Sequence, residues 1–154
     1  MSSEPRTTVG LADVAPDLSL AMMNFMQVAY PGKVDLVTRE LVRIYSGRKS
    51  ECRICRNFRL HAAIDRGFEE SMVDELDDLD TSSLAPHQKA ALRLAHAFLD
   101  DPRAFDTDAQ AELFRYYTPE QAAELVLDLV RYRPGSKLTV VAGNEPAEDA
   151  LIYS

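Results

Sequence analysis

Apolar residues recur at three- and four-residue intervals through most of this chain, and such spacing is typical of amphipathic helices. The pattern predicts helices over residues 18–29, 34–46, 51–66, 69–80, 86–101, 107–116 and 119–133, with a final apolar run at 138–142. Glycine and proline are expected to end these segments at Pro31-Gly32, Gly47, Gly67 and Pro134-Gly135. The β-branched stretch 139–141 has no obvious partner strand. We therefore predict an all-α fold, a compact bundle of about seven to eight helices.

The length and composition indicate one ordinary globular domain. The chain has 154 residues, and one domain per roughly 150 residues is the usual expectation. Hydrophobic residues make up 46% and charged residues 27%, which is far from the composition of a disordered chain. We predict a single domain over residues 1–154, with residues 1–14 as a flexible arm.

The charge and the hydropathy pattern argue against several classes of protein. Seventeen basic and 25 acidic residues give a net charge of −8, the wrong sign for a protein that binds nucleic acid. No apolar run approaches the roughly 20 residues of a membrane-spanning helix. The first residues lack the apolar core of a secretory signal. We expect a soluble cytoplasmic protein that binds neither nucleic acid nor membrane.

The two cysteines give the strongest chemical signal, because they stand together as Cys52-Arg-Ile-Cys55. A C-x-x-C pair at the start of a helix can hold a thiolate and can close into a disulfide. Two alternatives remain open: inert packing, and half of a zinc site. Zinc usually needs four ligands, and the histidines at 61, 87 and 96 form no second close-spaced pair. We favour redox chemistry, without a metal or a bound cofactor.

The spacing along the predicted cysteine helix suggests which charged residue lies near the sulfurs. Arg59 follows Cys55 by four residues and would share its face of the helix. His61 would lie roughly 240° around the axis and is predicted to be a surface or packing residue. Glu40, on the preceding helix, has an ordinary interpretation as an ion-pair partner of Arg39 or Arg43.

The segment 37–67 resembles the core of a known family. Glu40, eleven intervening residues, Cys52-x-x-Cys55 and Gly67 stand at the spacing of the carboxymuconolactone decarboxylase superfamily, in its alkylhydroperoxidase D-like branch. The segments 86–98, 118–132 and 137–146 are similar to later helices of that family. The resemblance covers about residues 18–147, and it implies the all-helical fold of that branch.

The resemblance also implies a reaction. Cys55 would attack a peroxide or a disulfide, Cys52 would resolve it to the intramolecular disulfide, and a lipoyl-bearing or thioredoxin-type protein would restore the thiols. Family members are trimers or hexamers, so a homo-oligomer is expected. The chain is thus predicted to be a thiol-dependent peroxidase or disulfide reductase.

One position departs from the family pattern. The histidine that relays a proton between the second cysteine and the glutamate is replaced by Arg59, and arginine cannot shuttle protons. The positive charge of Arg59 would instead lower the pKa of the Cys55 thiol, and Glu40 would pair with Arg59. We therefore expect a slow peroxidase.

Two other functions remain open. A decarboxylase-type lyase or isomerase would clamp a small carboxylated substrate with Arg59 and move protons with Glu40. A lyase does not need two cysteines, which argues against this alternative. The third possibility is a non-catalytic redox-sensing module in which the cysteine pair only opens and closes.

Overall fold

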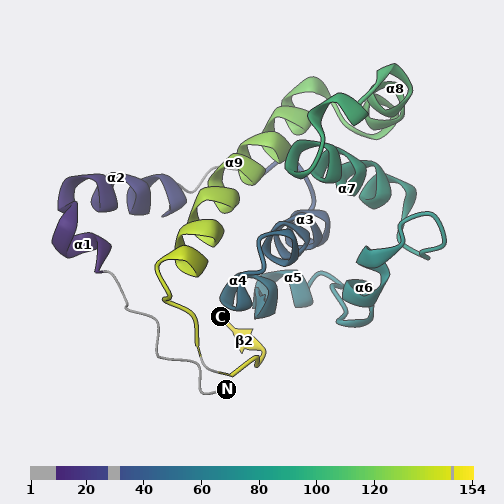
Figure 1. Ribbon diagram of the computed structural model, residues 1–154. Helices are drawn as coiled ribbons and strands as arrows, with labels where there is room; N and C mark the ends of the chain where they lie inside the picture. Colours follow the sequence, from purple (N-terminus) through teal and green to yellow (C-terminus); the bar gives the residue numbers. More distant parts are fainter. Residues whose placement is uncertain (1–9, 28–31, 147) are drawn as a thin grey trace, which may run out of the picture.

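The computed structural model describes residues 10–27, 32–146 and 148–154, and in these residues the chain is a helical bundle (Figure 1). Its α-helices are α1 Leu11–Val14, α2 Pro16–Gln27, α3 Leu36–Lys49, α4 Arg53–Asn57, α5 His61–Ile64, α6 Ser71–Asp74, α7 Pro86–Leu99, α8 Thr107–Tyr116 and α9 Pro119–Val141. Two 3-10 turns span Glu75–Asp77 and Pro102–Ala104. The strands β1 Phe58–Arg59 and β2 Ile152–Tyr153 pair in parallel. The all-α prediction is confirmed.

The core forms around α3, which packs against α4, α7 and α9 (Figure 1). Asp35 begins this helix by accepting a hydrogen bond from the Thr38 amide at 2.8 Å. Helices α3, α7 and α9 each supply fully buried aliphatic side chains, among them Leu41, Ile44, Leu92, Leu125 and Leu129. Burying one such side chain contributes about 1.5–3 kcal/mol. These contacts fix the position of α3, and the cysteine segment begins directly after the end of α3.

Helix α9 continues through Pro134, although we predicted that it would stop there. A proline inside a helix removes one backbone hydrogen bond and costs about 3 kcal/mol. Beyond it, Gly135 lies against α2, because a Cβ at Gly135 would be 3.0 Å from the Met26 Cε. The Thr139 hydroxyl donates to the Gly135 carbonyl at 2.9 Å. We attribute the continuation to this packing, which sequence spacing does not report.

The ends of the predicted segments differ elsewhere too. Residues 11–14 form helix α1, where a flexible arm was predicted, and residues 1–9 lie outside the described residues. The expected stop at Pro31-Gly32 falls partly outside them as well. The acidic segment 69–80 forms only α6 and a 3-10 turn. Among the described helices, none is long and apolar enough to cross a membrane.

Candidate functional site: the cysteine pair

Cys52 and Cys55 form a disulfide at the start of α4. Cys52 occupies the N-cap position, and its sulfur accepts a hydrogen bond from the Cys55 amide at 3.2 Å. The Cys52 side chain is completely buried, whereas Cys55 is partly exposed. The two cysteines therefore differ in exposure, and Cys55 is the more accessible residue of the pair.

Gly47 lets α4 approach α3 closely enough to hold this pair. We predicted that Gly47 would end a helix, but α3 continues to Lys49. A Cβ at Gly47 would lie 2.7 Å from the Cys55 carbonyl carbon and 2.8 Å from the Arg56 nitrogen. Both are backbone atoms, so they yield only if α4 moves. The glycine is a contact surface for the cysteine helix.

The turn between the two helices has an unusual backbone. Glu51, directly before Cys52, has a φ of 57°, in the left-handed region that residues with a Cβ seldom adopt. Such a conformation costs of the order of 1 kcal/mol and needs support from its surroundings. The Cys52 amide supplies part of that support by donating to the Gly47 carbonyl at 3.1 Å.

Glu40 pairs with Arg43 rather than with Arg59, which corrects our expectation. The Arg43 Nε and Nη2 atoms lie 2.9 and 2.7 Å from the two oxygens of Glu40. Glu40 is 1% and Arg43 8% exposed. The ordinary interpretation of Glu40 as a partner of a nearby arginine is the one that the structure shows.

The Glu40–Arg43 pair also divides the cysteine segment, which we predicted as one helix over 51–66. Arg43 donates to the Cys55 carbonyl at 2.8 Å and to the Phe58 carbonyl, while Glu40 accepts the Leu60 amide at 3.0 Å. These side chains satisfy backbone groups that a continuous helix would pair internally. The chain therefore ends α4 at Asn57 and begins α5 at His61.

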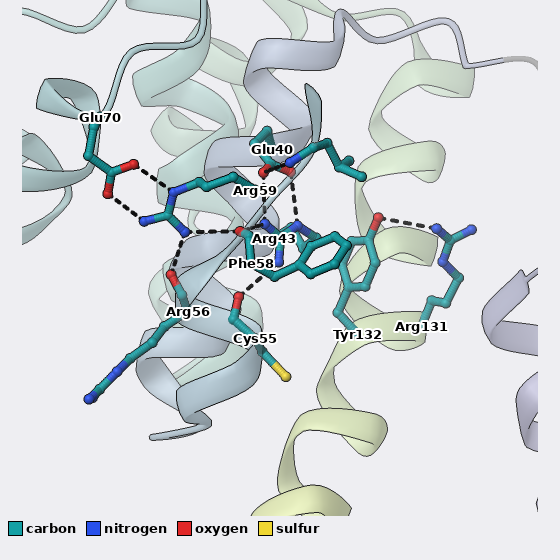
Figure 2. Close-up of polar contacts among 10 residues, drawn as sticks. Glu40, Arg43, Cys55, Arg56, Phe58, Arg59, Glu70, Arg131 and Tyr132 are labelled. Carbon is teal, nitrogen blue, oxygen red and sulfur yellow. Dashed lines mark hydrogen bonds and ion pairs between the residues drawn. The ribbon is translucent and has the colours of Figure 1, made fainter. Parts of the chain in front are cut away.

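Arg59 lies in β1 instead of on the cysteine helix, so it does not share the face of Cys55. Its side chain is 2% exposed and binds both oxygens of Glu70, at 2.7 and 2.5 Å. Its Nη1 atom also donates to the Arg56 and Phe58 carbonyls. In Figure 2 the Cys55 sulfur points away from both Arg59 and Glu40.

A small cavity of about 140 Å³ lies beside Glu40, between α3 and α9. It is lined by Leu36, Arg39, Glu40, Leu60, Arg131 and Tyr132. Arg39 binds the buried Asp128 at 2.8 Å. Burial raises the pKa of the Tyr132 hydroxyl above its ordinary value, and the nearby Asp128 raises it further. The walls of the cavity are mainly apolar, with charged groups of both signs among its lining residues.

The three histidines lie near residues other than the cysteine pair. His61 is exposed, as predicted, and its ring lies 5.9 Å from that of Tyr153. His96 Nδ1 is 2.8 Å from the Tyr45 hydroxyl, and His87 Nε2 is 3.6 Å from Asp35. Among the described residues, no three histidine, cysteine or acidic side chains are grouped to hold a metal ion.

Solved structures share this architecture. A crystal structure of a protein of unknown function from Agrobacterium tumefaciens, described as a putative antioxidant defence protein AhpD, matches with a TM-score of 0.74 at 15% identity, over 93% of this chain and 100% of that one. The debrominase Bmp8 matches with a TM-score of 0.68 at 20% identity, over 88% of this chain and 74% of that one. This chain has the alkylhydroperoxidase D-like fold. The predicted resemblance is confirmed at the level of the fold.

The sequence relatives are uncharacterised proteins and give no activity for this chain. The uncharacterised protein Rv2313c of Mycobacterium tuberculosis is 35% identical over 130 residues, which cover 82% of this chain and 45% of that protein. The chain thus spans about half the length of that relative. The uncharacterised protein YdfG of Bacillus subtilis is 23% identical over 141 residues, covering 90% and 96%. No protein-family model matches the sequence.

Sequence reasoning missed two residues that shape the site on this alkylhydroperoxidase D-like fold. Arg43 was considered only as an ordinary partner of Glu40, and its contacts with the cysteine-helix carbonyls were not foreseen. Gly47 was read as a helix end. Its place between flanking helical residues was the only available signal, since a glycine inside a helix often marks a close approach.

Proposed function

We propose that this chain is a thiol–disulfide oxidoreductase, acting as a disulfide reductase and, more slowly, as a thiol-dependent peroxidase. The observation that supports it is the unequal cysteine pair at the start of α4. Cys55 is partly exposed, while the buried Cys52 sulfur already accepts the Cys55 amide hydrogen. A thiolate on Cys52 would be stabilised by that same hydrogen bond.

In the proposed cycle, the thiolate of Cys55 attacks a substrate disulfide and expels one substrate thiolate. The Cys52 thiolate then attacks the Cys55 sulfur, expels the second substrate thiolate and closes the Cys52–Cys55 disulfide. A dithiol donor of the lipoyl or thioredoxin type reverses these steps, so that two electrons pass from donor to substrate.

Disulfide substrates suit this site better than peroxides. A departing thiolate is stable near neutral pH, whereas an alkoxide leaving a peroxide needs a proton. The family's relay histidine is replaced by Arg59, which already binds Glu70 and two backbone carbonyls. We therefore expect peroxide turnover to be the slower activity.

Glu40 and Arg59 act as positioning residues in this proposal. Glu40 orients Arg43, and Arg43 holds the carbonyl of Cys55 at 2.8 Å. Arg59 holds the Arg56 carbonyl at 2.6 Å, and its charge is balanced by Glu70. Together they keep α4 in the orientation that exposes Cys55 and covers Cys52. This role replaces the charge effect that we expected from Arg59.

A second candidate is chemistry on a small carboxylated or halogenated compound. A cysteine-to-alanine variant of Bmp8, whose fold is similar, was crystallised with 2,3,4-tribromopyrrole. In this chain Arg59 is occupied, so it would not clamp a carboxylate; the cavity with Arg39, Glu40 and Arg131 would receive such a substrate. Activity that survives removal of both cysteines would favour a lyase. A pair that cycles without turnover would favour a redox sensor.

The proposed thiol chemistry also suggests where the protein acts. A dithiol donor that keeps returning the pair to its reduced form is found in the cytoplasm, where we place this chain. We also propose a homo-oligomer, a trimer or hexamer, because apolar side chains of α2 are exposed in the single chain.

Turnover assays test the proposal. The reduced protein should reduce an aromatic disulfide with excess dithiol, should act more slowly on cumene hydroperoxide, and should lose both activities in the double variant Cys52→Ser/Cys55→Ser. Undiminished turnover by the double variant, or no turnover of either substrate by the wild type, would overturn the proposal.

A further inference from the structure

A segment that follows α9 lies across the cysteine helix. We call residues 144–146 and 148–154 the strap; in Figure 1 it runs from the end of α9, past α4, to β2. A turn at Gly143, with a φ of 72°, directs it away from α9. The strap pairs with β1 through β2, and the Ser154 carbonyl accepts the His61 amide at 2.9 Å.

Two acidic side chains of the strap bind α4 itself. The Glu145 carboxylate accepts a hydrogen bond from the Arg53 amide at 2.6 Å. Further along, Asp149 binds the side chains of Arg56 and Asn57. Glu148 lies between Glu145 and Asp149 in the sequence and is exposed. Among the described residues, it makes no hydrogen bond or ion pair with α4.

The strap is fastened to the outside of the bundle. The Arg56 and Asp149 side chains are 33% and 50% exposed. Its larger apolar residues, Leu151, Ile152 and Tyr153, are 43%, 36% and 52% exposed. No strap residue is buried among the described residues, so changes in the strap should leave the core intact. Substitutions in the strap should therefore act mainly on its contacts with α4.

Glu145 and Cys52 both accept backbone amide hydrogens from the first turn of α4. The Cys52 sulfur accepts the Cys55 amide, and Glu145 accepts the Arg53 amide, one residue after Cys52. A hollow of about 550 Å³ next to this turn is lined by Glu51, Arg53, Arg56, Val140, Gly143 and Glu145. Two arginines and two glutamates line this hollow, so the charge of Glu145 offsets cationic charge that would otherwise favour a thiolate.

We propose that Glu145 of the strap sets the redox poise of the cysteine pair by disfavouring the thiolate of Cys52. This inference rests on the proposed oxidoreductase function. A donor thiolate attacks the Cys55 sulfur, the disulfide breaks, and Cys52 departs as a thiolate. The donor's second thiolate then releases Cys55, which takes up one donor proton, while Cys52 stays a thiolate and the other donor proton passes to water. Because the reduced state carries this thiolate, the carboxylate of Glu145 destabilises the reduced state and so favours the disulfide.

The reduction potential of the full chain tests this inference. Wild type, Glu145→Gln, Glu148→Gln and Asp149→Asn are equilibrated in buffers of reduced and oxidised dithiothreitol, quenched, and the thiols counted by mass spectrometry. Glutamine keeps an oxygen for the Arg53 amide but removes the charge. Glu145→Gln should favour the dithiol about threefold, which is ~15 mV less negative at 29.6 mV per tenfold. The Glu148→Gln control should match the wild type.

The variants separate charge at Cys52 from loosening of the strap. Asp149→Asn weakens the attachment to Arg56 without touching the Arg53 amide, so its potential should shift less than that of Glu145→Gln. An unchanged potential in Glu145→Gln, or an equal shift in Glu148→Gln or Asp149→Asn, would overturn the inference. A wild-type pair that cannot be cycled between dithiol and disulfide would instead overturn the proposed function.

Discussion

At the scale of single residues, the cysteine pair depends on neighbours that carry no redox chemistry. Gly47 provides the surface on which α4 rests, and the buried Glu40–Arg43 pair holds the carbonyl at Cys55. Removing one partner of a buried ion pair leaves an uncompensated charge, which costs more than the pair contributes to stability. These residues therefore affect stability and site geometry together.

Gly47→Ala should displace α4 because the added Cβ would meet backbone atoms at 2.7 and 2.8 Å. We expect a loss of about 1–3 kcal/mol in the free energy of unfolding, reduced by the better helix propensity of alanine. Urea denaturation measures it. Gly135→Ala is the matched control, since its Cβ would meet only the flexible end of Met26 at 3.0 Å. Equal stability of Gly47→Ala and wild type would contradict the close approach.

Arg43→Met should lower the free energy of unfolding by about 3–5 kcal/mol, because Glu40 would stay buried without its partner. Adding Glu40→Leu should cost less than it does in the wild type, because it removes the unpaired charge, although the Leu60 amide loses its acceptor. Guanidinium denaturation of both single variants and of the double variant gives the comparison. Strictly additive losses would show that the pair is not coupled as described.

At the scale of elements, helical spacing predicted most of the bundle, and the failures have identifiable physical causes. The 51–66 helix is divided because Arg43 and Glu40 occupy backbone groups from another helix, a contact that local spacing cannot report. Helix α9 passes Pro134 because Gly135 packs on α2. The cysteines were found from their spacing, whereas the placement of Arg59 failed because it assumed an unbroken helix.

The strap should detach from α4 in acid. Hydrogen bonds from Arg56 and Asn57 hold the pKa of Asp149 below its ordinary value. The contribution of this contact is thus complete above the ordinary value of about 3.9 and is lost as the pH falls through the lowered value. An NMR titration should show the Arg56 and Asn57 side-chain signals changing with that midpoint. Signals that change equally in Asp149→Asn would contradict the assignment.

At the scale of the whole molecule, α1 and α2 lie outside the bundle and touch it mainly through α9 (Figure 1). Met22 and Met26 line a cavity of about 220 Å³ against Gly135 and Leu138, so part of the apolar surface is used within the chain. Val14, Leu18 and Leu20 remain 75%, 72% and 58% exposed. We propose that this exposed apolar surface is used in contacts between copies of the chain.

Light scattering after size exclusion should therefore give a mass that is a multiple of 17.2 kDa. Leu18→Ser and Leu20→Ser together should shift the population toward the single chain, because they remove exposed apolar surface. Thr107→Ser on α8 serves as a control that leaves this surface alone. A wild type that elutes as a single chain would contradict the predicted homo-oligomer.

The most direct test of the central claim is the site at which a substrate sulfur is captured. Reduced Cys52→Ser and Cys55→Ser proteins are each treated with an aromatic disulfide, and the adducts are mapped by mass spectrometry. The account predicts a stable mixed disulfide on Cys55 in Cys52→Ser, formed much faster than any adduct on the buried Cys52 in Cys55→Ser. Equal capture by both variants, or faster capture at Cys52, would contradict the unequal roles of the two cysteines.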